Sequence, residues 1–224
     1  MGRRLGFLVV CAVLWAALGG TYAHAAFPGQ NGKILFSGPT TINPDGTDRT
    51  TLPLFTGIAA TWSPDGTKIA SEGVGGVQIS NADGSGAMQI YETGGVIEAI
   101  DWSPDGEQIV FWDHTFEKEE GDTALLIVLD VDGQGGHVLV DPGTVIAMGL
   151  SWSPRGDRIA FQGFFGGELG IYTIDPDGTG LQQITDGNRW SPDFSPNAAK
   201  LVAERWDGTQ TDVVVMNADG SGET

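Results

Sequence analysis

Cysteine is almost absent from this chain, and its single copy lies close to the start. Among 224 residues the only cysteine is Cys11. A chain with one thiol forms no internal disulfide and offers no cysteine cluster for a metal ion. Stability must therefore come from packing and hydrogen bonds.

Basic residues are the second scarcity. The chain has 11 Lys and Arg against 29 Asp and Glu, which gives a formal net charge of −18. A strongly negative surface repels nucleic acid and anionic membranes, so we expect no nucleic-acid partner. The same charge favours solubility, and it is compatible with basic partners or divalent cations.

Long apolar runs are also missing, except at the N-terminus. Arg3 and Arg4 precede a run of 14 mostly apolar residues, Leu5 to Leu18, which is too short to span a bilayer comfortably. Ala23-His24-Ala25 has the form of a signal-peptidase site. A single membrane anchor is the alternative, whereas a twin-arginine or lipoprotein signal fits the residues less well.

We therefore predict a secretory signal peptide over 1–25 and a folded domain over 26–224. The protein would be exported, to the cell exterior or to the periplasm and cell envelope, with no stable membrane insertion after cleavage. Cleavage would also remove Cys11, which excludes cysteine-based catalysis.

Sustained helical periodicity is absent too, and short turn motifs take its place. Trp102-Ser103-Pro104-Asp105-Gly106 predicts a tight turn between two strands, with Pro104 at its first central position and Gly106 in a left-handed conformation. The same aromatic-Ser-Pro motif begins at Trp62, Trp152 and Phe194, at spacings of 40, 50 and 42 residues. Repeats of this length built from short strands are typical of β-propeller blades.

A second turn alternates with the first. It has the form Asn/Asp-x-Asp-Gly and begins at residues 43, 81, 130, 175 and 217. Asp-Gly between apolar runs is a strong hairpin signal. The two turns together predict an all-β propeller of four-stranded antiparallel blades, with units at about 33–55, 56–93, 94–143, 144–187 and 188–224.

The first and last of these five units are incomplete. The first has no inner strand, and the last has no outer strand because the sequence stops where that strand would begin. A truncated ring and an irregular or intermolecular closure are both consistent with this, and truncation is favoured because unpaired edges are liabilities.

The repeat also carries a family resemblance. The pattern Trp-Ser-Pro-Asp-Gly-x-x-Ile-Ala/Val-Phe, followed by Ile-Tyr-x-x-Asp-Pro-Asp-Gly, resembles the WD40-like repeats of the TolB-type β-propeller family. The best matches are Trp152–Phe161 with Gly170–Thr185, and Trp62–Ala70 with Val77–Ile90. The resemblance covers about residues 33–220 and implies the propeller fold. It leaves no room for the N-terminal domain by which TolB contacts the Tol system, so we do not expect TolB's own role.

Catalytic groups are few. His114 lies in a charged insertion over 113–122, and His137 begins an outer strand. Nothing in the sequence pairs either histidine with a nucleophile. The segment Gly149-Leu150-Ser151-Trp152-Ser153 resembles the Gly-x-Ser-x-Gly motif of serine hydrolases. It ends in serine instead of glycine, and Ser151 falls in a predicted strand and not at a strand-to-helix turn. We predict no catalytic and no cofactor-binding residues.

The acidic turns raise the question of calcium. Asp130-x-Asp132 and Asp175-x-Asp177 offer alternate carboxylates, but no distal glutamate completes an EF-hand loop, and turn chemistry explains all five copies. We predict no metal site. The 113–122 insertion is the most distinctive surface loop, although a solvated loop is the simpler interpretation. Three tryptophans lie off the repeat register and could line a face or channel, although packing is the simpler role: Trp112, Trp190 and Trp206.

These features predict a secreted, non-enzymatic β-propeller that binds a protein, peptide or ligand through its loop faces or channel, with binding residues unidentified. The alternatives are the propeller portion of a peptidase-associated hydrolase, a propeller lyase whose catalytic part is absent, or a gene fragment.

Overall fold

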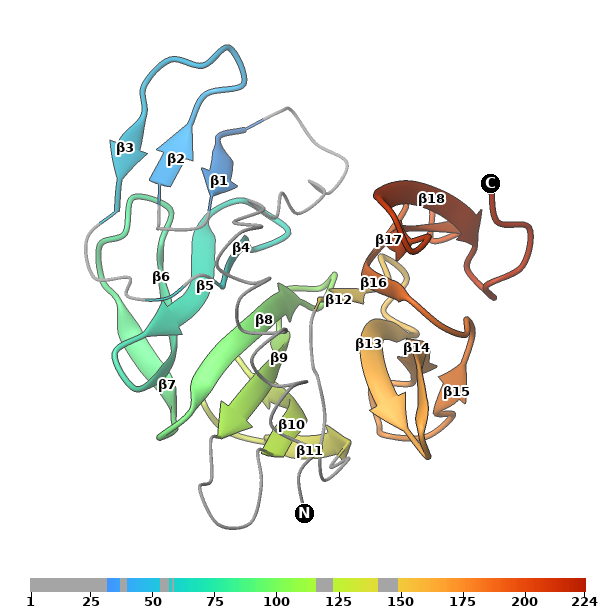
Figure 1. The fold of residues 1–224 in the computed structure, drawn as a ribbon. Coiled ribbons are helices and arrows are strands. Elements are labelled where there is room, and N and C mark those ends of the chain that lie inside the picture. The colour runs from blue at the N-terminus through green and yellow to red at the C-terminus, as the bar shows by residue number, and fades with distance from the viewer. Residues whose placement is uncertain (1–31, 37–39, 53–56, 58, 116–122, 141–148) are drawn as a thin grey trace, which may run out of the picture.

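The computed structural model describes residues 32–224 except 37–39, 53–56, 58, 116–122 and 141–148 (Figure 1). The predicted signal peptide and most of the 113–122 insertion lie outside the described residues. All regular structure in the described residues is β-strand, arranged in five antiparallel sheets. The all-β prediction and the five-unit prediction are therefore confirmed.

Each sheet is built from consecutive strands. The first contains β1 (Ile34–Phe36), β2 (Thr40–Ile42) and β3 (Thr50–Thr51). The second contains β4 (Ala60–Trp62), β5 (Lys68–Gly73), β6 (Gly76–Asn81) and β7 (Met88–Glu92). The third contains β8 (Val96–Trp102), β9 (Gln108–Thr115), β10 (Thr123–Asp130) and β11 (His137–Val140).

The fourth sheet contains β12 (Leu150–Trp152), β13 (Ile159–Phe165), β14 (Glu168–Ile174) and β15 (Gln182–Gln183). The fifth contains β16 (Arg189–Phe194), β17 (Lys200–Trp206) and β18 (Thr211–Asn217). Strand order within every sheet follows the sequence. Figure 1 shows the sheets following one another around an arc, with the first and the fifth at its two ends.

Both predicted turns form as expected. In the first type, the Gly106 N–H donates to the Ser103 carbonyl at 2.9 Å, and Gly106 has φ +74°. The Asp105 carboxylate accepts from the Ser103 hydroxyl at 2.6 Å and from the Glu107 N–H at 3.0 Å. The copy of this motif that begins at Phe194 has alanine in place of glycine, and it keeps the same backbone conformation, with Ala198 at φ +57°.

The second turn fixes one register in every sheet. The residue two before its Asn or Asp pairs with the residue seven after it, as in Ile79 with Met88 and Val128 with His137. The fifth sheet follows the same rule, since Val215 and Thr224 exchange both backbone hydrogen bonds at 2.9 Å. Thr224 therefore pairs with β18 in the same register as the first residue of the outer strands in the other sheets.

The core consists of the contacts between successive sheets. We call the side of each sheet that contacts the next sheet its following face, and the other side its preceding face. The following face of the second sheet (Ala70, Val77, Ile79) packs on the preceding face of the third, which includes Trp102 and Phe111. The third and fourth sheets, and the fourth and fifth, join in the same way.

Polar contacts near the inner strands reinforce this packing. The buried Asp101 carboxylate accepts from its own chain neighbour, the Trp102 N–H, at 2.9 Å and from the Trp152 N–H of the next sheet at 2.7 Å. One sheet further, Ser151 donates to Asp193 at 3.0 Å and accepts from the Phe194 N–H at 3.2 Å. Each inner strand is thus tied to its successor beside the repeat aromatic.

Candidate functional site

The candidate site is a cavity of about 510 Å³ between the outer part of the fourth sheet and the end of the fifth. The hollow is broadly open to solvent, so it suits a surface-bound segment better than an enclosed small molecule. Side chains and backbone of eight residues line it: Gln183, Ile184, Thr185, Asp186, Arg189, Gly220, Gly222 and Glu223.

Its first wall is the segment that follows β15. The Ile184 N–H donates to the Ile171 carbonyl of β14 at 2.9 Å, and the Ile171 N–H donates to the Thr185 hydroxyl at 3.0 Å. The Gln183 amide donates to the Thr185 carbonyl at 2.9 Å. These bonds hold the wall rigid although the strand proper has ended.

The second wall is the last Asp-Gly turn, from Asn217 to Gly220, with the residues after it. Gly220 has φ +84°, and a Cβ added there would overlap the Ile184 carbonyl oxygen. Only glycine allows so close an approach of the two backbones in this conformation. The fifth sheet is thus seated directly on the outer segment of the fourth.

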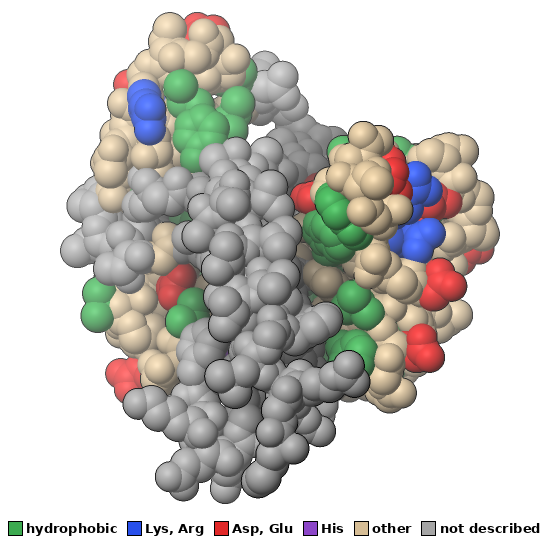
Figure 2. All heavy atoms as spheres, viewed as in Figure 1, with side chains coloured by type: hydrophobic (Ala, Val, Ile, Leu, Met, Phe, Trp, Pro, Cys, Tyr) green, Lys and Arg blue, Asp and Glu red, His purple; other side chains and the backbone are tan. Residues whose placement is uncertain are grey.

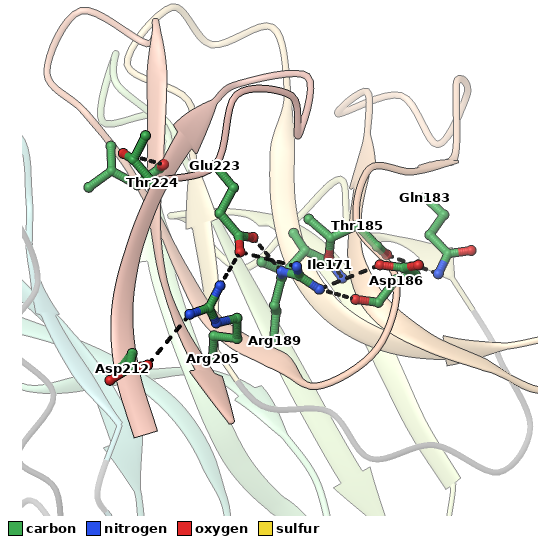
Figure 3. A network of polar contacts seen from close by, with 10 residues as sticks. Ile171, Gln183, Thr185, Asp186, Arg189, Arg205, Asp212, Glu223 and Thr224 are labelled. Carbon is green, nitrogen blue, oxygen red and sulfur yellow. Dashed lines mark hydrogen bonds and ion pairs between the residues drawn. The ribbon is translucent and has the colours of Figure 1, made fainter. Parts of the chain in front are cut away.

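Between the walls lies a network of charged side chains (Figure 3). The Arg189 guanidinium donates to the Glu223 carboxylate, from Nε at 2.5 Å and from Nη2 at 3.2 Å. Arg205 Nη1 donates to the same carboxylate at 2.7 Å, so two guanidinium groups hold one carboxylate. Arg189 also bonds the Asp186 carbonyl, and Arg205 reaches Asp212 at 3.5 Å.

The network stays charged over a wide pH range. Hydrogen bonds from Arg189, and secondarily from Arg205, hold the pKa of Glu223 below its usual value. The hydrogen bond to Glu223 likewise raises the pKa of Arg205. Groups whose pKa values are pushed apart in this way do not exchange a proton near neutral pH. The arrangement can hold a polar ligand through fixed charges, but these groups are poorly suited to acid–base chemistry.

One carboxylate stands at the lip of the cavity, with its Oδ1 3.5 Å from Arg189 Nη1. The Asp186 side chain is 94% exposed at the lip. Figure 2 shows Lys and Arg side chains among Asp and Glu side chains on the right of the view, where Figure 1 places the last sheet.

The residues that the sequence analysis weighed and rejected as catalytic groups lie elsewhere. His114 is buried in β9, with Nδ1 2.9 Å from Glu98 Oε1. His137 is exposed, with Nε2 3.0 Å from the Pro176 carbonyl. Ser151 is buried in β12 and serves the contact between sheets described above. The structure thus places none of these three residues at the cavity.

The Asp-Gly turns use their carboxylates locally. Asp132 accepts from the Gln134 N–H at 2.9 Å, and Asp177 accepts from the Thr179 N–H at 2.9 Å and its hydroxyl at 2.7 Å. Within the described residues, no group of three or more His, Cys, Asp or Glu side chains is placed to hold a metal ion. The described part of the chain also contains no helix of the length and apolarity needed to cross a membrane.

Repeat register does not decide how deeply each tryptophan is buried. Trp102 and Trp152 are buried between sheets. Of the three off-register tryptophans, Trp112 is fully buried and makes an edge contact with Phe161 at a centroid distance of 5.6 Å. Trp190 is half-buried and donates to Glu204 at 2.8 Å, while Trp206 is exposed.

Sequence reasoning did not find the cavity. Arg189, Arg205 and Glu223 belong to no motif, and Glu223 meets Arg189 across 34 residues of sequence. The sequence carries no local signal for these contacts, because the partners lie far apart along the chain.

The structure defines the protein as a β-propeller of five small antiparallel sheets. No family model matches the chain. Over 96 residues it is 31% identical to the Tol-Pal system protein TolB of Francisella tularensis subsp. mediasiatica (strain FSC147), a match that covers 41% of this chain and 22% of that protein. The match thus spans about a fifth of the length of the curated relative.

Solved structures extend the likeness to the whole fold. A putative TolB from Agrobacterium tumefaciens aligns with a TM-score of 0.73 at 19% identity, covering 91% of this chain and 79% of that one. TolB from Acinetobacter baumannii aligns with a TM-score of 0.67 at 17% identity, covering 99% and 58%. An oligogalacturonate lyase in complex with manganese aligns with a TM-score of 0.65 at 12% identity, covering 89% and 63%. This chain is therefore a TolB-like β-propeller.

Proposed function

We propose that this protein is exported to the cell envelope and acts there as a non-enzymatic β-propeller that binds another protein. The cavity between the fourth and fifth sheets would hold an extended, basic segment of that partner. The observation that carries this proposal is the cavity itself, with its fixed charges and its acidic lip.

Preorganisation supports binding at this place. Arg189 and Glu223 are already held by three hydrogen bonds between them and Arg205, so a ligand need not immobilise them. Binding to groups that are ordered beforehand costs less conformational entropy.

Charge supports a basic partner. The chain carries a net charge of −18, and the Asp186 carboxylate stands exposed at the lip. A negative field draws cationic segments toward the surface and raises their association rate. The distant relatives are named as components of the Tol-Pal system, which is a further reason to propose a protein partner in the envelope.

Selection of a random 12-residue peptide library against the purified protein tests the proposal. We expect enriched peptides to be rich in Lys and Arg, with affinities measured by fluorescence anisotropy. Asp186→Lys should weaken them at least about tenfold, which corresponds to about 1.4 kcal/mol. The matched control is Glu107→Lys, which makes the same charge change at an exposed position on the third sheet.

Equal loss of affinity in both variants would indicate a general charge effect and would refute the cavity as the site. Failure to enrich any peptide would refute the proposal of peptide binding. The Asp186 side chain is 94% exposed, so its replacement should leave the fold intact, which circular dichroism checks.

A further inference from the structure

Asp-Gly pairs recur along the chain, and one of them differs from all the others in its hydrogen bonding. Nine such pairs occur in the sequence, beginning at residues 45, 65, 83, 105, 132, 177, 186, 207 and 219. An aspartate side chain is open to attack by the backbone nitrogen that follows it, and glycine has no side chain to obstruct the approach. All nine pairs contain the same reacting groups, so the fold decides which of them reacts.

Eight of the nine carboxylates are held in place. Each accepts a hydrogen bond from the backbone N–H two residues further along the chain, at 2.8–3.0 Å. At Asp177 the Thr179 hydroxyl adds a second bond, and these bonds hold the pKa of Asp177 below its ordinary value. Such bonds favour the ionised carboxylate. That form resists attack, because the carboxyl group must be protonated before it can lose a hydroxyl group as water.

The attacking nitrogen is also held in seven of these eight pairs. Its N–H donates to the carbonyl three residues earlier, as Gly178 does to Asp175 at 2.9 Å. The eighth pair begins at Asp207, whose carboxylate accepts from three donors on the two residues Thr209 and Gln210. In all eight pairs at least one hydrogen bond must therefore break before the ring can close.

The pair Asp186-Gly187 has neither restraint among the described residues. The Asp186 side chain is 94% exposed, and its carboxylate contacts Arg189 Nη1 at 3.5 Å instead of a backbone N–H. Gly187 makes no bond to the carbonyl three residues earlier in the described part of the chain. A Cβ built on Gly187 meets no atom nearer than Arg189 Nη1 at 4.0 Å, so the surroundings leave room for the two groups to approach.

We propose that Asp186-Gly187 is a site of spontaneous isoaspartate formation, and the first of the nine pairs to convert. The Gly187 nitrogen attacks Cγ of the protonated Asp186 carboxyl group, the new N–C bond closes a five-membered imide, and the hydroxyl leaves as water with the amide proton. Solvent water then adds to the former main-chain carbon of Asp186 and breaks its bond to the nitrogen. The chain is now linked through Cγ. One water is released and one is consumed, so the mass is unchanged.

The conversion changes the polar network of the cavity. The main-chain carbonyl oxygen of Asp186, which accepts a hydrogen bond from Arg189 (Figure 3), becomes an oxygen of an ionised carboxylate. Hydrogen bonds between two charged groups are stronger than those to a neutral carbonyl. The product therefore competes with Glu223 for Arg189. This consequence depends on the network itself and not on the proposed ligand.

Incubation of the purified full-length protein in mildly acidic buffer made with heavy-oxygen water tests the proposal. Each opening of the imide places one solvent oxygen in the aspartyl residue, and peptide mapping by mass spectrometry locates that label. Chromatography separates the isoaspartyl peptide from the aspartyl peptide. We expect label and isoaspartate at Asp186 to accumulate at least about tenfold faster than at any other Asp-Gly pair, which corresponds to about 1.4 kcal/mol of activation free energy.

Two controls accompany this measurement. In concentrated urea the nine rates should become alike, because unfolding releases the held groups. Asp186→Glu keeps the charge but would require a larger ring, so label at residue 186 should disappear while the other eight rates stay unchanged. Circular dichroism checks that the incubated protein remains folded.

Equal rates at all nine pairs in the folded protein overturn the proposal, since the turn hydrogen bonds would then give no protection. Earlier conversion of another pair also overturns it, as does an Asp186 that stays unlabelled over the period in which the urea-unfolded chain converts. If Asp186 remains the fastest site in urea, its local sequence and not the fold sets the rate, which likewise contradicts the proposal.

Discussion

Replacing Gly220 with alanine probes how the fifth sheet is seated on the fourth. Gly220 has φ +84° in the last Asp-Gly turn, and Gly46 has φ +83° at the same position of the first. An alanine in this left-handed conformation costs about 1–2 kcal/mol at either site. The free-energy cost of the left-handed backbone is therefore the same in the two variants, and only the atoms around each site differ.

The surroundings of the two glycines predict that the alanine variants differ strongly in stability. A Cβ at Gly46 meets nothing within 4 Å, whereas a Cβ at Gly220 overlaps the Ile184 carbonyl oxygen and lies 3.2 Å from the Ile184 Cβ. Backbone atoms cannot rotate away, so the two sheets must separate. Such overpacking costs about 1–3 kcal/mol. We expect Gly46→Ala to lower the free energy of unfolding by about 1–2 kcal/mol and Gly220→Ala by about 2–5 kcal/mol.

Urea denaturation followed by tryptophan fluorescence measures both values on the same protein. In thermal unfolding each kcal/mol corresponds to roughly 2–4 °C for a domain of this size, so Gly220→Ala should melt several degrees below Gly46→Ala. Equal destabilisation of the two variants would show that the outer segment of the fourth sheet does not constrain the last turn. The reasoning about the cavity walls would then be wrong.

Two further predictions concern stability. Asp101→Asn should lower the free energy of unfolding by about 2 kcal/mol. The Trp102 and Trp152 N–H groups donate to different oxygens of the carboxylate, an amide keeps only one of these oxygens, and hydrogen bonds to a charged group contribute about 1.5–3 kcal/mol. Urea midpoints compared with Asp132→Asn, an exposed turn carboxylate, check this, and equal midpoints would contradict it. Acid should weaken the Ser-Pro-Asp-Gly turns. The hydrogen bond from the Ser63 hydroxyl lowers the pKa of Asp65 below its ordinary value of 3.8, so the stabilisation by this carboxylate is present above that value and is lost as pH falls through the lower folded pKa. The stability difference between the wild type and Asp65→Asn should therefore shrink as pH falls below about 4, and a difference that stays constant with pH would contradict it.

The sequence predicted the repeat because turn chemistry is local. Gly106 and Asp105 act within a few residues of one another, so their roles could be read without knowing any distant contact. Strand ends were less predictable. In the fourth sheet, for example, β12 begins only at Leu150, because the preceding Gly149, at φ +62°, is not extended.

Burial of the off-register tryptophans was not decided by the sequence. Trp112 and Trp206 share no motif, yet one is fully buried against Phe161 and the other is exposed at the end of β17. The outcome depends on whether another sheet covers the position, which is a property of the assembled arc.

The sequence by itself determined the all-β class, the five units and the two alternating turns, since each follows from short-range spacing. Only the tertiary structure decided where charges gather and which faces stay exposed. Arg189 meets Glu223 across 34 residues, and Val213 is exposed although its pattern matches that of buried Val77. The physical reason is that packing between sheets depends on which surfaces meet in space, and the repeat makes those surfaces chemically alike whether or not a neighbour is there.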